Sequence, residues 1–159
     1  MELRLDIPTA AAMQAFGARV ARLLQAGDVV VLTGDLGAGK TTFTQGLGDA
    51  LGVRGRVTSP TFVISRVHPP TGGGVALVHV DAYRLADSLE VADLDLEESL
   101  EESVTVIEWG AGLVESLAED RLEIAITRGR DDPDAGEVRS VVVSPVGSRW
   151  AGIDLGALA

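Results

Sequence analysis

The apolar residues of the chain are grouped in short runs that predict β-strands. Three runs are continuously apolar, as in strands buried on both faces, at residues 29–33, 75–80 and 104–107. Two later segments alternate apolar and polar residues, which indicates one buried and one solvent-facing side, at residues 121–127 and 137–143. Less regular strands are expected at residues 2–7 and 62–67, and a hairpin-like turn follows the second of them. These runs predict a mainly parallel sheet, with the late alternating pair as an antiparallel edge.

Helical spacing separates the strands. The apolar residues that share one face of the first predicted helix are Met13, Phe16, Val20, Leu23 and Leu24. Thr9 is suited to cap this helix, and Gly27 closes the segment. A second helix is predicted over residues 41–51, ended by Gly52, and a third, acidic one before residue 104.

The only lysine of the chain lies in a glycine-rich sequence that follows the first continuous strand. The nine residues are Gly34, Asp35, Leu36, Gly37, Ala38, Gly39, Lys40, Thr41 and Thr42. They match G-x-x-x-x-G-K-[ST] in full, the pattern of loops that bind the phosphates of nucleoside triphosphates. Every other basic residue is an arginine. We therefore predict one domain over residues 1–159 with a three-layer α/β P-loop NTPase fold, mainly parallel with added antiparallel edge strands; the tail from about residue 144 has no assigned role.

The chemistry of phosphate binding accounts for these residue types. Glycines let successive backbone N–H groups turn inward, and the next helix points its positive end at the same place. Lys40 is expected to reach the β- and γ-phosphates as a compact charge. The hydroxyl of Thr41 is expected to coordinate Mg²⁺. A plain glycine-rich turn between a strand and a helix is the alternative.

A phosphate-binding loop also needs a carboxylate for the metal or its water shell. Asp81 and Glu108 each follow a continuously apolar strand, and such groups lie at the carboxyl ends of strands in open α/β sheets. Either could be the metal ligand while the other orients the attacking water. Spacing alone does not rank them, and an acid after a strand also begins turns.

Four further features lie near these strand ends, and each has a simpler explanation. Trp109 could stack on adenine or pack in the core. Arg84 could offset charge on the γ-phosphate or form a surface ion pair. The hydroxyl-rich loop at residues 58–62 could sense the γ-phosphate or be a Ser-Pro turn. His79 lies within a strand and is predicted to be packed rather than catalytic.

Composition narrows the class of protein. The chain has 159 residues, a net charge of −11 and no cysteine, which excludes disulfides and thiolate chemistry. A domain this acidic is not expected to bind tRNA or other nucleic acid strongly on its own. No apolar run is long enough for a membrane span and the N-terminus lacks a signal-peptide pattern, so a cytoplasmic protein with no membrane contact is expected. The acidic residues crowd into 87–102, as a solvated helix face or a docking surface for a basic partner.

Four groups of residues, in this order and approximate spacing, resemble the bacterial TsaE (YjeE) family. The first is the glycine-rich sequence at 34–42. The others are Ser59, Pro60, Thr61 and Phe62; residues 79–85; and Glu108 with Trp109. The resemblance covers about residues 5–128. After Trp109 the chain has Gly110, Ala111 and Gly112, where members of the family commonly carry a proline and polar residues.

The resemblance implies a cytoplasmic ATPase that supports N6-threonylcarbamoyladenosine formation on tRNA together with the proteins TsaB and TsaD. It implies that Thr41 and Glu108 are the Mg²⁺ ligands, that Asp81 is the acid beside the γ-phosphate, and that Trp109 lies near the base. Catalysis is thus expected of Lys40 and Asp81, with weak hydrolysis by the chain alone.

Two other functions compete with an ATPase in a partner complex. A small-molecule kinase could use the same loop, although residues 85–120 contain no basic side chain from which an arginine-bearing lid could be built. A GTPase-type switch would need an Asn-Lys-x-Asp element, and the chain has no asparagine, so ATP is favoured over GTP.

Overall fold

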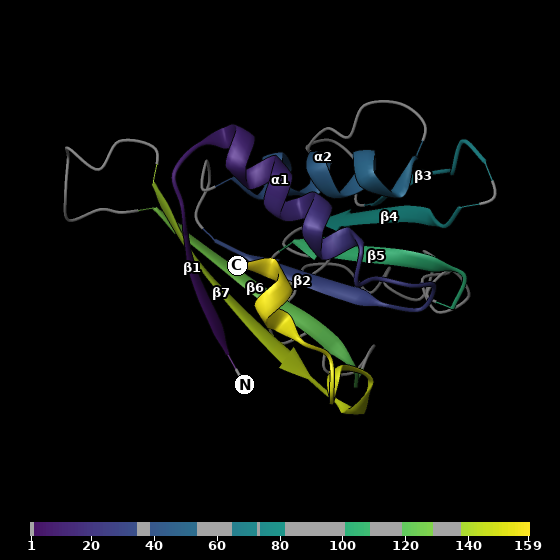
Figure 1. The fold of residues 1–159 in the computed structure, drawn as a ribbon. Helices are drawn as coiled ribbons and strands as arrows, with labels where there is room; N and C mark the ends of the chain where they lie inside the picture. Colours follow the sequence, from purple (N-terminus) through teal and green to yellow (C-terminus); the bar gives the residue numbers. More distant parts are fainter. Residues whose placement is uncertain are drawn as a thin grey trace.

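The computed structural model describes residues 2–34, 39–53, 65–72, 74–81, 101–108, 119–128 and 138–159 (Figure 1). Its elements in chain order are β1 (Leu3–Ile7), α1 (Ala10–Ala21), β2 (Val29–Thr33), α2 (Lys40–Leu51), β3 (Ser65–His68), β4 (Ala76–Asp81), β5 (Ser103–Glu108), β6 (Arg121–Arg128), β7 (Arg139–Val146), and the 3-10 helices η4 (Ser148–Trp150) and η5 (Leu155–Leu158). The predicted strands and the first two predicted helices are confirmed within a few residues. The predicted acidic helix lies outside the described residues.

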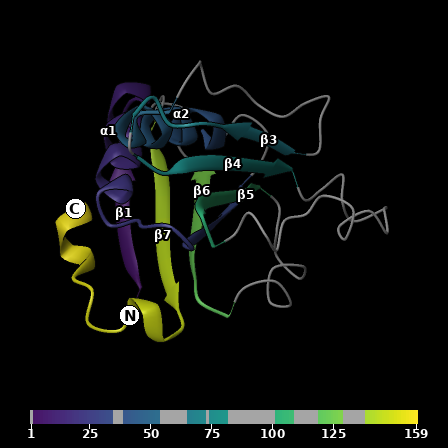
Figure 2. The same cartoon turned by 90° about the vertical axis from the view of Figure 1, so that its right-hand side faces the viewer.

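The described residues form one twisted sheet of seven strands in the order β1-β7-β6-β2-β5-β4-β3. The four central strands β6, β2, β5 and β4 are parallel, whereas β7, β1 and β3 pair antiparallel with their neighbours. The right-handed twist turns β7 across the direction of β4, as Figure 2 shows. The prediction of a parallel centre with antiparallel edges is confirmed.

The position of β6 differs from the prediction that both late strands form an antiparallel edge. β6 lies inside the sheet and pairs in parallel with β2, while β7 is antiparallel. Its residues alternate between buried and half-buried along most of its length. The alternation therefore reports that one face of this strand is better covered than the other, and it carries no information on strand direction.

Both helices pack on the same face of the sheet. Val30, Leu32 and Val106 share that face by register, and they belong to one core cluster with residues of α1 and α2. The helices approach so closely that a Cβ on Gly46 would lie 2.1 Å from the backbone oxygen of Gln14. Only glycine permits this contact, which fixes α2 against α1. Val31 and Ile107 on the other face are buried as well.

Local signals set the ends of the helices. The hydroxyl of Thr9 accepts a hydrogen bond of 3.0 Å from the Ala12 amide and caps α1, as predicted. α2 ends at Gly52 in the left-handed conformation, also as predicted. The Gly52 carbonyl then accepts from the amide and the hydroxyl of Thr71, which ties the turn after β3 to the end of α2.

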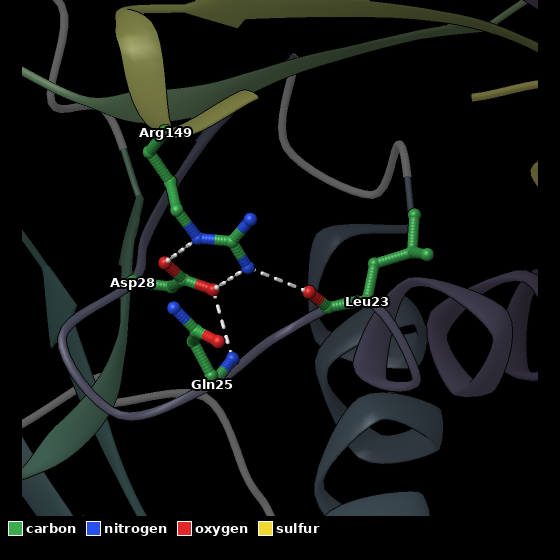
Figure 3. Close-up of polar contacts among 4 residues, drawn as sticks. All are labelled: Leu23, Gln25, Asp28 and Arg149. Carbon is green, nitrogen blue, oxygen red and sulfur yellow. Dashed lines mark hydrogen bonds and ion pairs between the residues drawn. The ribbon is translucent and has the colours of Figure 1, made fainter. Parts of the chain in front are cut away.

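The C-terminal segment is part of the core. Trp150, Leu155 and Leu158 are buried, and η5 lies beside α1 (Figure 1). Arg149 donates from Nε and Nη2 to the two carboxylate oxygens of Asp28, 3.0 Å each, and from Nη2 to the Leu23 carbonyl (Figure 3). Because Asp28 directly precedes β2, these bonds fasten the tail to the strand that leads into the glycine-rich loop.

Neither α1 nor α2, the α-helices of the described part of the chain, has the length and hydrophobicity that crossing a membrane requires.

Candidate functional site

The first turn of α2 lies at the end of the glycine-rich loop. Its N-cap, Gly39, has φ 115°, a left-handed conformation that favours glycine, and no side chain caps the helix there. The first amides of an α-helix have no partner within the helix. Together with the positive end of the helix dipole, they suit an anion such as a phosphate.

Lys40, the first residue of α2, folds back over the loop. Its side chain is buried at 7% relative exposure, and its Nζ donates a hydrogen bond of 2.6 Å to the carbonyl of Gly34. Gly34 directly follows β2, so the ammonium bridges the two ends of the loop. A buried ammonium held by a neutral carbonyl is well placed to exchange that acceptor for a charged phosphate oxygen.

The two candidate acids lie on adjacent strands at one edge of the sheet. Asp81 is the last residue of β4 and Glu108 the last of β5, and they face each other in the parallel register. Leu32, two residues before Gly34, faces Glu108 from the other side. The prediction that both acids lie at the carboxyl ends of strands is therefore confirmed for the backbone.

Glu108 is the better described of the two. Its residue is only 5% exposed, although it carries a carboxylate. A buried carboxylate is costly unless hydrogen bonds or cations compensate it. The Nε2 of His79 supplies one such bond, at 3.0 Å from Oε2 of Glu108.

His79 is thus a site residue whose contact with Glu108 the sequence did not predict. The expectation that it is packed is correct, since its exposure is 0%, but its ring also contacts the candidate metal ligand. His79 pairs with Val106 in the register, two residues before Glu108 on β5, so the side chains of His79 and Glu108 lie on the same face of the sheet. The contact depends on the register between β4 and β5, and the continuously apolar run at residues 75–80 gives no signal for it.

The available donors fit Mg²⁺. Thr41 lies in the first turn of α2 with a partly exposed side chain, and Glu108 supplies a carboxylate; both offer the oxygen ligands that this ion prefers. Across the described ranges, no three His, Cys, Asp or Glu residues cluster as a metal site. Mg²⁺ usually takes one or two protein ligands and completes its shell with phosphates and water, so two oxygen donors suffice.

Several predicted site residues lie outside the described residues. They are Asp35, Leu36, Gly37, Ala38, Arg84, Trp109 and the segments 58–62 and 110–112. Of the described candidates, Gly39, Lys40, Thr41 and Thr42 lie together at the start of α2, as predicted from the motif.

Comparisons with known proteins show which family the chain resembles. The family model described as threonylcarbamoyl adenosine biosynthesis protein TsaE matches residues 7–137. A Streptomyces coelicolor protein named tRNA threonylcarbamoyladenosine biosynthesis protein TsaE is 60% identical over 148 residues, covering 92% of this chain and 99% of its own. A Bacillus subtilis protein of the same name is 42% identical over 125 residues, covering 78% and 73% of the two chains.

The fold is also found in a solved structure. The crystal structure of Bacillus subtilis YdiB aligns with a TM-score of 0.73 at 30% sequence identity. The alignment covers 95% of this chain and 90% of that one, so the whole architecture is shared and not only the loop and its flanking elements.

Proposed function

The chain belongs to the TsaE family, and from this premise we propose that it is a Mg²⁺-dependent ATPase that supports the formation of N6-threonylcarbamoyladenosine on tRNA. The observation that carries the proposal is the position of Lys40. Its ammonium bridges the two ends of the glycine-rich loop, at the sheet edge where the buried carboxylate of Glu108 ends the next strand.

The residues of the chain have distinct roles in this proposal. The amides at the start of α2 bind phosphate oxygens, and Lys40 leaves the Gly34 carbonyl to bind the β- and γ-phosphates. Thr41 and Glu108 hold Mg²⁺, which when bound neutralises the charge that develops on the phosphates. Asp81, beside Glu108 in the register, orients the attacking water. The family resemblance gives Trp109, which lies outside the described residues, the role of contacting the base.

The ATPase acts with partners and not alone. We expect slow hydrolysis by the isolated chain and faster or productively coupled hydrolysis with TsaD and TsaB, in the cytoplasm where tRNA is modified. The net charge of −11 supports a division of labour in which the partners hold the tRNA. Glu101 and Glu102, the last two residues of the acidic segment 87–102, lie exposed just before β5.

Phosphate release and nucleotide binding test the proposal directly. The purified chain should bind ATP more tightly than GTP by calorimetry, and release phosphate from ATP and Mg²⁺ with no acceptor present. Lys40→Ala should abolish turnover, and Glu108→Gln should weaken its Mg²⁺ dependence. Glu123→Gln is the control, because it makes the same change at a carboxylate on another strand. The partner of Glu123 is Arg121, at 2.8 Å.

Four results would contradict the proposal. An absolute requirement for a phosphate acceptor would indicate a small-molecule kinase. Preference for GTP would indicate a different switch protein. Full Mg²⁺-dependent activity of Glu108→Gln would show that Glu108 is not a ligand of the metal. The absence of stimulation by TsaD and TsaB would show that the chain does not act with these partners.

A further inference from the structure

His79 and Glu108 form a buried polar pair beside the glycine-rich loop. The imidazole is completely buried, the Glu108 side chain is 7% exposed, and 3.0 Å separates Nε2 from Oε2. The other ring nitrogen, Nδ1, is buried without a hydrogen-bond partner among the described residues. The ring therefore directs its one polar contact at Glu108.

The contact assigns the hydrogen on the ring. A Glu108 that binds a metal ion through an ionised carboxylate only accepts hydrogen bonds, and in that state Nε2 is the donor to Oε2. His79 is completely buried and faces Val106 in the register, so its ring has little room to leave this contact.

A carboxylate with one oxygen fixed in this way loses most of its rotational freedom. Glutamate has three side-chain torsions, and a buried donor at Oε2 selects among their combinations. Metal-binding carboxylates are commonly hydrogen-bonded by outer residues, whose removal typically costs about 10–100-fold in metal affinity. His79 on β4 contacts the carboxylate of Glu108 at the end of β5, which is the position of such an outer residue.

We propose that His79 is a positioning residue that orients the carboxylate of Glu108 for Mg²⁺ through its Nε2–H group. The inference rests on the proposed function, because it takes Glu108 as a ligand of the nucleotide-bound metal. It goes beyond that function because it gives His79, a residue within a strand, a role at the metal site. Packing alone would also account for the burial of this residue.

Metal binding tests the proposal without relying on turnover. Mn²⁺ binding by the full chain with ADP is measured by electron paramagnetic resonance, and ADP binding in EDTA by calorimetry. His79→Leu should weaken Mn²⁺ binding about tenfold or more and leave metal-free ADP binding unchanged. His79→Gln, which keeps an amide N–H donor, should stay within about threefold of the wild type.

A matched control separates orientation from burial. Thr105 lies on β5 with its Oγ1 buried and unpartnered within the described part of the chain, three residues before Glu108 and on the other face. Thr105→Val also removes a buried polar group from this region, so it should leave Mn²⁺ binding unchanged. An equal loss in Thr105→Val would overturn the proposal, because the effect would then come from the disturbed core.

Other results would also overturn it. A folded His79→Leu that binds Mn²⁺ like the wild type leaves His79 a packing residue, with the ATPase proposal intact. Failure of the wild type to bind Mn²⁺ with ADP overturns both proposals. If His79→Leu does not fold, ¹⁵N NMR of the wild-type imidazole decides: the hydrogen should be on Nε2 and its resonance should shift with Mg²⁺ and ADP, and a hydrogen on Nδ1 or no shift contradicts the role.

Discussion

The contact between α1 and α2 should be intolerant of a single added methyl group at Gly46. A Cβ built there would lie 2.1 Å from the Gln14 carbonyl oxygen and 2.6 Å from the adjoining carbon atoms. Ordinary contacts begin near 3.4 Å. The neighbour is backbone and not the end of a flexible side chain, so the helices must separate by more than about 1 Å.

The cost follows from two opposing effects. Overpacking a close-packed interior costs about 1–3 kcal/mol, and a backbone clash belongs at the upper end. Alanine in place of glycine within a helix returns about 1 kcal/mol. We therefore expect Gly46→Ala to lower the free energy of unfolding by about 2 kcal/mol, which for a chain of this size lowers Tm by roughly 4–8 °C.

The same displacement should reach the site, because α2 begins with Lys40. A hydrogen bond to phosphate lengthened by about 1 Å is effectively lost. One lost bond of ~1.4 kcal/mol raises the Kd for ATP about tenfold. Thermal unfolding measures the first effect, and calorimetry with ATP and Mg²⁺ well below Tm measures the second.

Two more substitutions make the test specific. Gly72→Ala is the control, since nothing lies within 4 Å of its added Cβ. Gly17→Ala places a Cβ 2.2 Å from the Phe43 carbonyl oxygen in the same helix contact. Because one separation of the helices relieves both clashes, the double variant should lose less than the sum of the single losses. A Gly46→Ala protein with the Tm and ATP affinity of Gly72→Ala would refute the reasoning.

Three further predictions concern stability and are checked by urea unfolding. Arg149→Ala should cost about 3 kcal/mol, because it leaves the buried Asp28 carboxylate without its cation; a loss no greater than that of an exposed arginine would contradict this. Leu158→Ala should cost about 2–3 kcal/mol, since the side chain is fully buried, and an unchanged midpoint would mean that η5 does not pack on the core. Thr9→Ala should cost about 1 kcal/mol through loss of the Ala12 bond, whereas Thr9→Ser should cost little.

Features that depend on neighbouring residues were predictable from the sequence. The strand before the glycine-rich sequence and the helix after it follow from contiguous apolar residues, glycines and one lysine, and the structure has them at residues 29–33 and 40–51. The cap at Thr9 and the end at Gly52 depend on residues within one turn. Local chemistry decides all of these.

Features that depend on pairing between distant segments were not predictable from the sequence. Strand β7 continues to Val146, past the predicted end at residue 143. Pro145 has no N–H to donate, and the strand tolerates it because β1 no longer pairs with β7 at that residue. His79 and Glu108 are 29 residues apart, and Arg149 and Asp28 are 121 apart. Their contacts depend on sheet order and register, which periodicity within one strand does not specify.

The Arg149–Asp28 ion pair and the α1–α2 contact at Gly46 should have separable effects on nucleotide binding. Arg149 holds Asp28 at the start of β2, five strand residues, or roughly 17 Å, before the loop. Gly46 holds α2, whose first residue is Lys40. Loss of the Arg149 contact should therefore lower stability without changing ATP affinity measured well below Tm, while Gly46→Ala changes both. If Arg149→Ala weakened ATP binding as much as Gly46→Ala at equal loss of stability, the loop would respond to global stability and not to the placement of α2.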